Sequence, residues 1–203
     1  MTPRRATIER STRETQIRLA LELDGEGRSR RRIDVPNGFF AHMLDALATH
    51  GGLGLELEAR GDTHVDLHHT VEDVGICLGQ ALLEALGDRR GLVRFAHAYA
   101  PLDEALARAV VDISGRGFLV CKMPPELEQV WVTAEFPLSL IVDFFHALAD
   151  RGRLTLHLDV LAARNAHHAA EAAFKAVALA LRQALALRTG EQAVPSTKGS
   201  LTV

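Results

Sequence analysis

Hydrophobic residues alternate with polar or small residues along residues 15–27 of the chain. A period of two is typical of a half-buried strand, and the glycines at the end of this stretch indicate a turn. We expect residues 29–35 to follow as the hairpin partner of this strand. The apolar positions of the first strand are Ile17, Leu19, Leu21 and Leu23.

The next apolar pattern has the spacing of a helix. In residues 37–52, Phe40, Met43 or Leu44, and Leu47 recur every three or four residues, and two glycines end the pattern. The same criteria predict further helices and strands in the rest of the chain. The helices are expected within 63–88 (ending at Gly87), 137–152 and 165–187, and the strands at 53–61, 105–114, 117–123 and 153–162.

The order strand, strand, helix, strand, helix therefore occurs twice. Residues 47–57 align with residues 148–158 at an offset of 101 residues, which indicates a fused duplication because solenoid repeats are shorter. We predict an α+β fold: a tandem duplication of a β-sheet-plus-two-helix unit, with helices packed on one sheet face. We place the first α+β repeat at residues 1–92, the second at 93–190 and an extended tail at 191–203.

Each repeat carries two adjacent histidines with a glutamate three residues after the second one. At about 100° per residue on a helix, the three side chains project from one side and apolar residues occupy the other. Imidazole and carboxylate groups together suit Mn, Fe, Zn or Ni. One such cluster is typical of a solvated helix N-terminus, but two aligned copies favour a two-metal site that needs both helices. The clusters are His68, His69 and Glu72, and His167, His168 and Glu171.

The opposite side of each of these two helices is predicted to be buried. The predicted core positions are Val71, Val74, Leu78, Leu82 and Ala85 in the first helix, and Ala170, Ala173, Val177, Leu181 and Ala184 in the second.

Composition narrows the classes of function. The chain is 47% hydrophobic, enough for a sizeable core, and its net charge of −3 gives no reason to expect nucleic acid or membrane binding. No apolar run approaches the roughly 18 residues that a membrane helix needs. Cys77 and Cys121 fit neither a zinc spacing nor a disulfide framework, which suggests a reducing cytoplasm.

Four stretches resemble imidazoleglycerol-phosphate dehydratase, a family of histidine biosynthesis: FFAHMLDALATHGG, GDTHVDLHHTVEDVGICLGQAL, ARNAHHAAEAAFKAVALALRQA and PSTKG. The resemblance runs from about Arg4 to Gly199. It implies two halves like ribosomal protein S5 domain 2, each a four-stranded sheet backed by helices. It also implies a hydro-lyase, a carbon–oxygen lyase that converts D-erythro-imidazoleglycerol phosphate to imidazole acetol phosphate and water.

The resemblance further implies two Mn(II) ions per active site, no organic cofactor, and a large homo-oligomer of about 24 subunits with active sites between subunits. The implied metal ligands are His42, His68, His69, Glu72, His167, His168 and Glu171, and the catalytic residues are Glu14, Glu171, His69 and His168. The implied substrate-binding residues, several of them on the phosphate, are Glu14, His50, Arg94, Arg116, Lys175, Ser196 and Lys198.

Some of these assignments leave alternatives open. From the residues alone, His42 is more typical of a helix surface or core, and His50 of a helix C-terminus. Either Glu14 or Glu171 is expected to move the proton.

One position departs from the family. Asp143 stands where the family has a metal-ligating histidine, and it aligns with His42 at the offset of 101 residues. Aspartate is a ligand for Mn(II), so Asp143 is expected to bind metal, with His146 one turn further along as the alternative. The substitution supports a second interpretation, a non-catalytic or altered metal-binding oligomeric relative of the dehydratase. A di-metal phosphatase is a third, disfavoured by the imidazole-rich ligand set.

Overall fold

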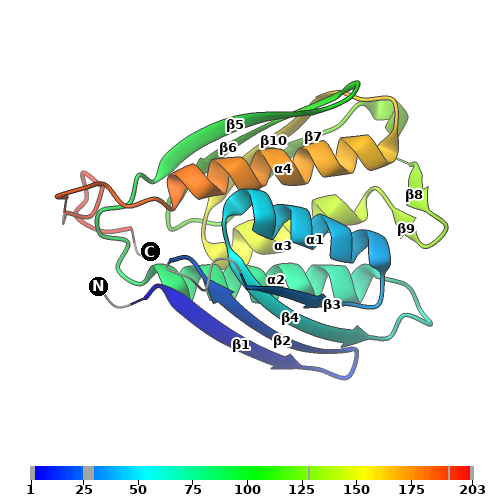
Figure 1. Cartoon of the computed structure of the whole chain (residues 1–203), viewed down its shortest axis with the longest axis horizontal. Coiled ribbons are helices and arrows are strands. Elements are labelled where there is room, and N and C mark those ends of the chain that lie inside the picture. Colours follow the sequence, from blue (N-terminus) through cyan, green and yellow to red (C-terminus); the bar gives the residue numbers. More distant parts are fainter. Residues whose placement is uncertain (1–2, 25–29, 128, 192, 202–203) are drawn as a thin grey trace.

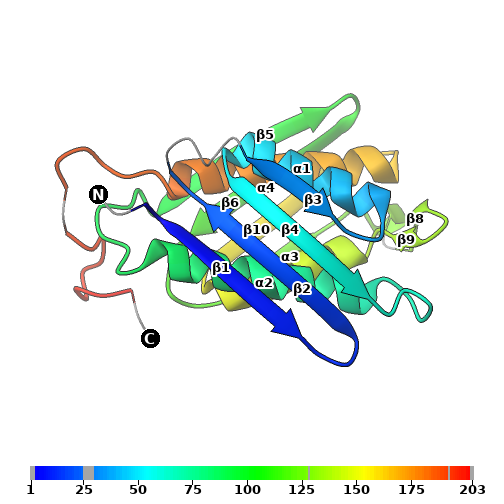
Figure 2. The same cartoon turned by 60° about the horizontal axis from the view of Figure 1, so that its bottom comes forward.

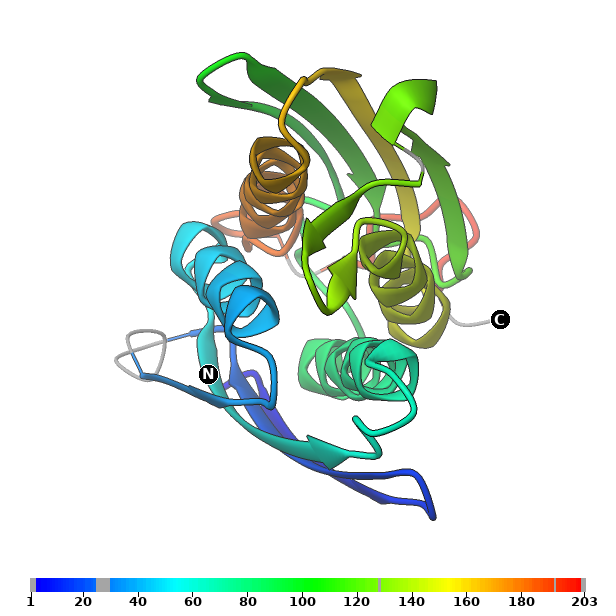
Figure 3. The ribbon, with the colours of Figure 1, turned by 90° about the vertical axis from the view of Figure 1, so that its right-hand side faces the viewer.

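Two four-stranded sheets enclose a layer of helices (Figures 1 and 3). The computed structural model describes residues 3–24, 30–127, 129–191 and 193–201. The two sheets around a helix layer confirm the predicted α+β fold, in which each sheet packs its helices on one face only.

The first sheet has the strand order β1-β2-β4-β3 (Figure 2). The β1–β2 and β2–β4 pairs are antiparallel, whereas β3 runs parallel to β4. The prediction of a hairpin between β2 and β3 was therefore wrong: β1 and β4 occupy both edges of β2, so β3 joins the far edge of β4. The predicted glycine turn at residues 25–27 lies outside the described residues. The bounds are β1 Arg5–Ser11, β2 Thr15–Glu22, β3 Arg31–Asp34 and β4 Gly54–Gly61.

The second sheet repeats this topology in the order β5-β6-β10-β7. Only β7 is parallel to its neighbour. The edge strands β1 and β5 were absent from the sequence prediction. β1 exposes most of its side chains, and β5 points mainly alanines inward, so neither carries a strong apolar alternation. The bounds are β5 Phe95–Leu102, β6 Ala105–Asp112, β7 Phe118–Lys122 and β10 Thr155–Ala162.

The helices of the two repeats exchange partners. α1 packs beside α4 and α2 packs beside α3, so each close pair joins one helix from each half of the chain (Figure 3). All four helices direct their N-terminal ends to the same end of the molecule (Figure 1). Their bounds, close to those predicted, are α1 Gly38–Gly51, α2 His68–Leu86, α3 Leu140–Gly152 and α4 Ala166–Ala184.

One continuous hydrophobic cluster fills the space between the sheets. All ten predicted core positions of α2 and α4 are buried, which confirms the orientation of both helices. The predicted boundary between residues 92 and 93 falls between α2 and β5. The hydrophobic core contains residues from both sides of it, and the division into two domains stays a prediction.

A short insertion and the chain end complete the fold. A 3-10 helix, Pro125–Leu127, and the two-stranded β8 Trp131–Thr133 and β9 Phe136–Pro137 precede α3, and none of these was predicted. The end of the chain folds back on the molecule, where Arg94 Nη1 donates to Pro195 O at 2.6 Å. The buried Arg89 donates to the carbonyl oxygen of Leu201.

Candidate metal centre

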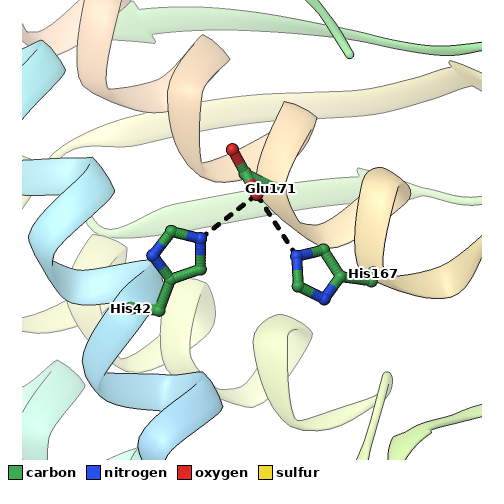
Figure 4. Close-up of side chains that lie close together, drawn as sticks. All are labelled: His42, His167 and Glu171. Carbon is green, nitrogen blue, oxygen red and sulfur yellow. Dashed lines mark hydrogen bonds and ion pairs between the residues drawn. The ribbon is translucent and has the colours of Figure 1, made fainter. Parts of the chain in front are cut away.

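His42, His167 and Glu171 meet where α1 packs against α4 (Figure 4). The Nε2 atoms of His42 and His167 lie 3.2 and 3.3 Å from the same carboxylate oxygen of Glu171. The possible ligand atoms of the three residues all lie within 4.8 Å of one another. Two imidazoles and one carboxylate at this spacing form a donor set that fits Mn(II) and related ions.

Local packing holds this group, the His42–His167–Glu171 cluster, in place. The Phe39 ring meets the His167 ring edge-on at 5.2 Å, and Phe136 of β9 covers Phe39 at 5.0 Å. At the start of α4, the Asn165 side chain accepts hydrogen bonds from the backbone N–H groups of His167 and His168, which fixes the first turn. The unpredicted β8–β9 insertion therefore supports the site.

Lys175 lies one turn along α4, with Nζ 2.5 Å from Glu171 Oε1. Burial raises the pKa of Glu171, but the hydrogen bonds from Lys175 and with His42 outweigh it, so the pKa lies below its usual value. The carboxylate is thereby held ionised, the form that binds a metal. Lys175 was assigned to the substrate, and in this chain it contacts Glu171.

His68, Glu72 and Asp143 lie near one another where α2 packs against α3, but the two carboxylates face different nitrogens of the His68 ring, so the three are less convergent than the first cluster. His68 Nδ1 lies 3.5 Å from Asp143 Oδ2, and His68 Nε2 lies 3.9 Å from Glu72 Oε2. These residues align in the duplication with His167, Glu171 and His42. His146, the alternative to Asp143, is exposed one turn further along α3. The structure thus brings Asp143 to the place that the repeat assigns it.

The second histidine of each pair turns away from these groups. His69 Nδ1 lies 3.1 Å from Asp62 Oδ2, and His168 Nδ1 lies 2.8 Å from Glu104 Oε2. The hydrogen bond to Asp62, with further support from the charge of Glu14, raises the pKa of His69 despite partial burial. The hydrogen bond from His168 lowers the pKa of Glu104 to about 2.

The two histidine-rich helices do not share a site within one chain. α2 and α4 lie diagonally across the helix layer (Figure 3), and each contributes to a separate cluster with α3 or α1. The expectation that both helices hold a shared pair of ions is therefore not met by a single chain, because exchange of helix partners separates them.

The predicted phosphate-binding residues lie at the opposite end of the molecule. The backbone N–H of Arg94 donates to Ala184 O at the C-terminal end of α4, about 25 Å along that helix from His167. Its guanidinium pairs with Asp112 at 2.8 Å. Arg116 is exposed between β6 and β7, and Ser196 and Lys198 follow the Pro195 carbonyl that Arg94 binds.

Glu14 and His50, the remaining predicted substrate-binding residues, lie in different places. Glu14 is exposed in the turn before β2, at the end of the molecule that carries the clusters, and its backbone carbonyl accepts a hydrogen bond from Asp62 N at 3.1 Å. His50 lies in the last turn of α1, about 12 Å along the helix from His42. The structure brings Glu14 towards His69 but leaves His50 apart from the clusters.

The sequence model of imidazoleglycerol-phosphate dehydratase matches residues 36–181. A relative of that name from Halorhodospira halophila is 53% identical over 99% of this chain and 100% of its own length. The chain belongs to the imidazoleglycerol-phosphate dehydratase family. A second dehydratase, from Magnetococcus marinus, is 50% identical over 97% of this chain and 98% of its own length.

Solved structures of imidazoleglycerol-phosphate dehydratases agree with this fold. The enzyme from Staphylococcus aureus superposes with a TM-score of 0.79 at 38% identity, covering 91% of this chain and 99% of its own. The enzyme from Pyrococcus furiosus gives a TM-score of 0.79 at 34% identity, covering 95% and 99%. No helix in the described ranges is long and apolar enough to cross a membrane.

Sequence reasoning missed two carboxylates of this dehydratase-family chain, Asp62 and Glu104. Asp62 directly follows β4 and Glu104 directly precedes β6, so neither lies in a periodic element that marks an exposed face. For Glu104 a signal existed: Glu14 stands at the matching place before β2, and the duplication points from one to the other.

Proposed function

We propose that the chain catalyses the metal-dependent dehydration of D-erythro-imidazoleglycerol phosphate to imidazole acetol phosphate and water, as a hydro-lyase of histidine biosynthesis. The observation that carries the proposal is the His42–His167–Glu171 cluster, a convergent set of metal-ligand atoms in a chain of this family. The proposed metal ligands and Glu14 lie at one end of the molecule, and the proposed phosphate-binding residues lie at the other.

The His42–His167–Glu171 cluster is proposed to hold one Mn(II) ion, and His68, Glu72 and Asp143 a second. The donor atoms of the first cluster lie within 4.8 Å of one another. In the second, His68 Nδ1 lies 3.5 Å from Asp143 and His68 Nε2 lies 3.9 Å from Glu72. Bound Mn(II) supplies Lewis acidity and a template for an azole substrate. His69 and His168 face away from both groups, so we propose that they complete the sites of neighbouring subunits.

Glu14 is the better candidate of the two glutamates for moving the proton. The carboxylate of Glu171 is held by His42, His167 and Lys175 together. Glu14 is exposed at the tip of the β1–β2 turn, and its charge acts on His69. A general acid–base group needs a carboxylate free to approach the substrate, which favours Glu14 as the proton carrier and Glu171 as a ligand.

The separation of the two residue sets supports an active site between subunits. Arg94, which binds the chain end at Pro195, contacts Ala184 at the far end of α4, about 25 Å along that helix from His167, too far for one small phosphate ester to reach both. A symmetric homo-oligomer brings the tail end of one subunit to the metal end of another. We propose a shell of about 24 subunits, in a cytoplasm that keeps Cys77 and Cys121 reduced.

The proposal is tested with metal-stripped protein, added Mn(II) and the substrate, following the absorbance of imidazole acetol phosphate and the release of inorganic phosphate. We expect Mn(II)-dependent product without phosphate release. His167→Ala should lower kcat by about 100-fold or more because it removes a ligand. His157→Ala, on the exposed face of β10, is the matched control and should keep full activity.

Other outcomes decide against the proposal in different ways. Turnover that persists after chelation removes the metal from the reaction. Release of phosphate indicates a phosphatase. Tight Mn(II) binding without product in an intact assembly identifies the altered, non-catalytic relative that Asp143 suggests.

A further inference from the structure

Glu104, in the turn between β5 and β6, joins three groups with one carboxylate. Its Oε2 accepts a hydrogen bond from His168 Nδ1 at 2.8 Å. Its Oε1 accepts from the backbone N–H groups of Asn165 at 2.9 Å and Arg164 at 3.3 Å. The carboxylate therefore binds the β5–β6 turn to the start of α4 and to one imidazole of the histidine pair.

This contact determines which nitrogen of His168 carries the proton. A carboxylate only accepts, so His168 Nδ1 must donate, and the neutral ring then keeps a lone pair on Nε2. Metal-ligating histidines commonly donate their other ring nitrogen to a carboxylate in this way, which fixes the tautomer and the ring orientation. Asp62 holds His69 by the same contact at 3.1 Å.

We propose that Glu104 is a positioning residue for metal binding: it orients His168 so that Nε2 is presented, as a lone pair, to an ion. The proposal rests on the proposed metal dependence and adds a residue to it. Glu104 acts through His168 and does not touch the ion. The backbone contacts of Asn165 and Arg164 fix the carboxylate itself, so the ring is held against a rigid element.

An amide in place of this carboxylate cannot satisfy the same partners. Glutamine has one acceptor oxygen, whereas Glu104 uses both of its oxygens for different donors. If the amide oxygen keeps the Asn165 N–H, the amide NH₂ faces His168 Nδ1 and requires a lone pair there. The proton then moves to Nε2, which removes the ligand atom while the backbone contacts are retained.

Asp103 is the residue that separates this role from direct ligation. Its Oδ2 lies 3.9 Å from His168 Nε2, and Asp103, Glu104 and His168 together satisfy the spacing of a metal cluster. If these three residues bound an ion directly, both carboxylates would matter equally. If Glu104 positions the ring, Asp103 is dispensable.

The experiment measures Mn(II) binding to the full-length, metal-stripped protein by electron paramagnetic resonance, with folding checked by circular dichroism in chelator. Glu104→Gln should weaken Mn(II) binding by about 10- to 100-fold at the sites that use His168. Asp103→Asn and the matched control Glu9→Gln, an exposed carboxylate on β1 that pairs with Arg18, should bind as the unmodified protein does.

Wild-type affinity in folded Glu104→Gln overturns the proposal, and so does an equal loss in Asp103→Asn. Should Glu104→Gln fail to fold, Glu104→Asp decides. Its carboxylate is one methylene shorter and cannot reach the ring and both backbone groups, so we expect about three- to tenfold weaker binding, and an unchanged affinity overturns the proposal. Failure of the unmodified protein to bind Mn(II) rejects the proposed metal dependence instead.

Discussion

Gly79 on α2 lies where α3 approaches most closely, and a methyl group there should force the two helices apart. A Cβ atom built at Gly79 lies 2.7 Å from both Gly152 N and Leu148 O. Ordinary van der Waals contact begins at 3.4 Å. Gly79→Ala therefore requires a displacement of about 0.7 Å, the difference between these distances.

The displaced atoms belong to the backbone of α3, so no change of rotamer can relieve the contact. Overpacking of this kind costs about 1–3 kcal/mol, and we expect the upper half of that range. Alanine gains about 1 kcal/mol over glycine in a helix interior. The net expectation is a loss of about 1–2 kcal/mol in the free energy of unfolding, together with a wider gap between His68 and Asp143, now 3.5 Å.

Urea unfolding in chelator, at one fixed protein concentration, measures the stability. Mn(II) titration reports on the group of His68, Glu72 and Asp143. Gly38→Ala is the control, because a Cβ at Gly38, the first residue of α1, meets nothing within 4 Å. Gly38→Ala should leave stability equal or higher. Gly79→Ala that is as stable as Gly38→Ala, with Mn(II) affinity unchanged, refutes the close approach of α2 and α3.

Two further predictions concern titratable groups. Lys175 lowers the pKa of Glu171. The Lys175–Glu171 pair therefore stabilises the fold above pH 4.5, and this stabilisation is lost as the pH falls through the lowered pKa of Glu171. Lys175→Met should cost about 0.5 kcal/mol near neutral pH, and its difference from the unmodified protein should shrink between about pH 5 and 3; a constant difference in chelator contradicts the pairing. Burial raises the pKa of Cys77 and of Cys121 to about 11. Both thiols should therefore react slowly with iodoacetamide at pH 8 and rapidly after unfolding, and fast labelling of the native protein contradicts the raised pKa values.

The sequence predicted the elements whose apolar residues recur at a regular spacing. The alternation from Ile17 to Leu23 located β2, and the apolar arc from Val71 to Ala85 fixed the orientation of α2. β1 and β5 were missed because an edge strand buries little, and alanines pointing inward carry a weak apolar signal. The parallel pairing of β3 was missed because β3 does not pair with β2, the strand before it in sequence, but with β4, which follows after helix α1.

The sequence identified the residues of the candidate site but not which of them lie together. Adjacent histidines identified both clusters, and the repeat offset identified Asp143. Which helix faces which is a tertiary property, so no spacing indicated that His167 meets His42 while His68 meets Asp143. Asp62 and Glu104 lie in connections between elements, where periodicity gives no direction for a side chain.

The crossed pairing of helices means that neither half of the chain contains all the residues of either cluster. A half-length ancestor would have needed a second copy of itself to build either cluster, and that pair would have been identical by symmetry. In one chain the two halves need not be identical, so each cluster can change by itself. The histidine at position 42 and the aspartate at the equivalent position 143 show such a difference, an imidazole in one cluster and a carboxylate in the other.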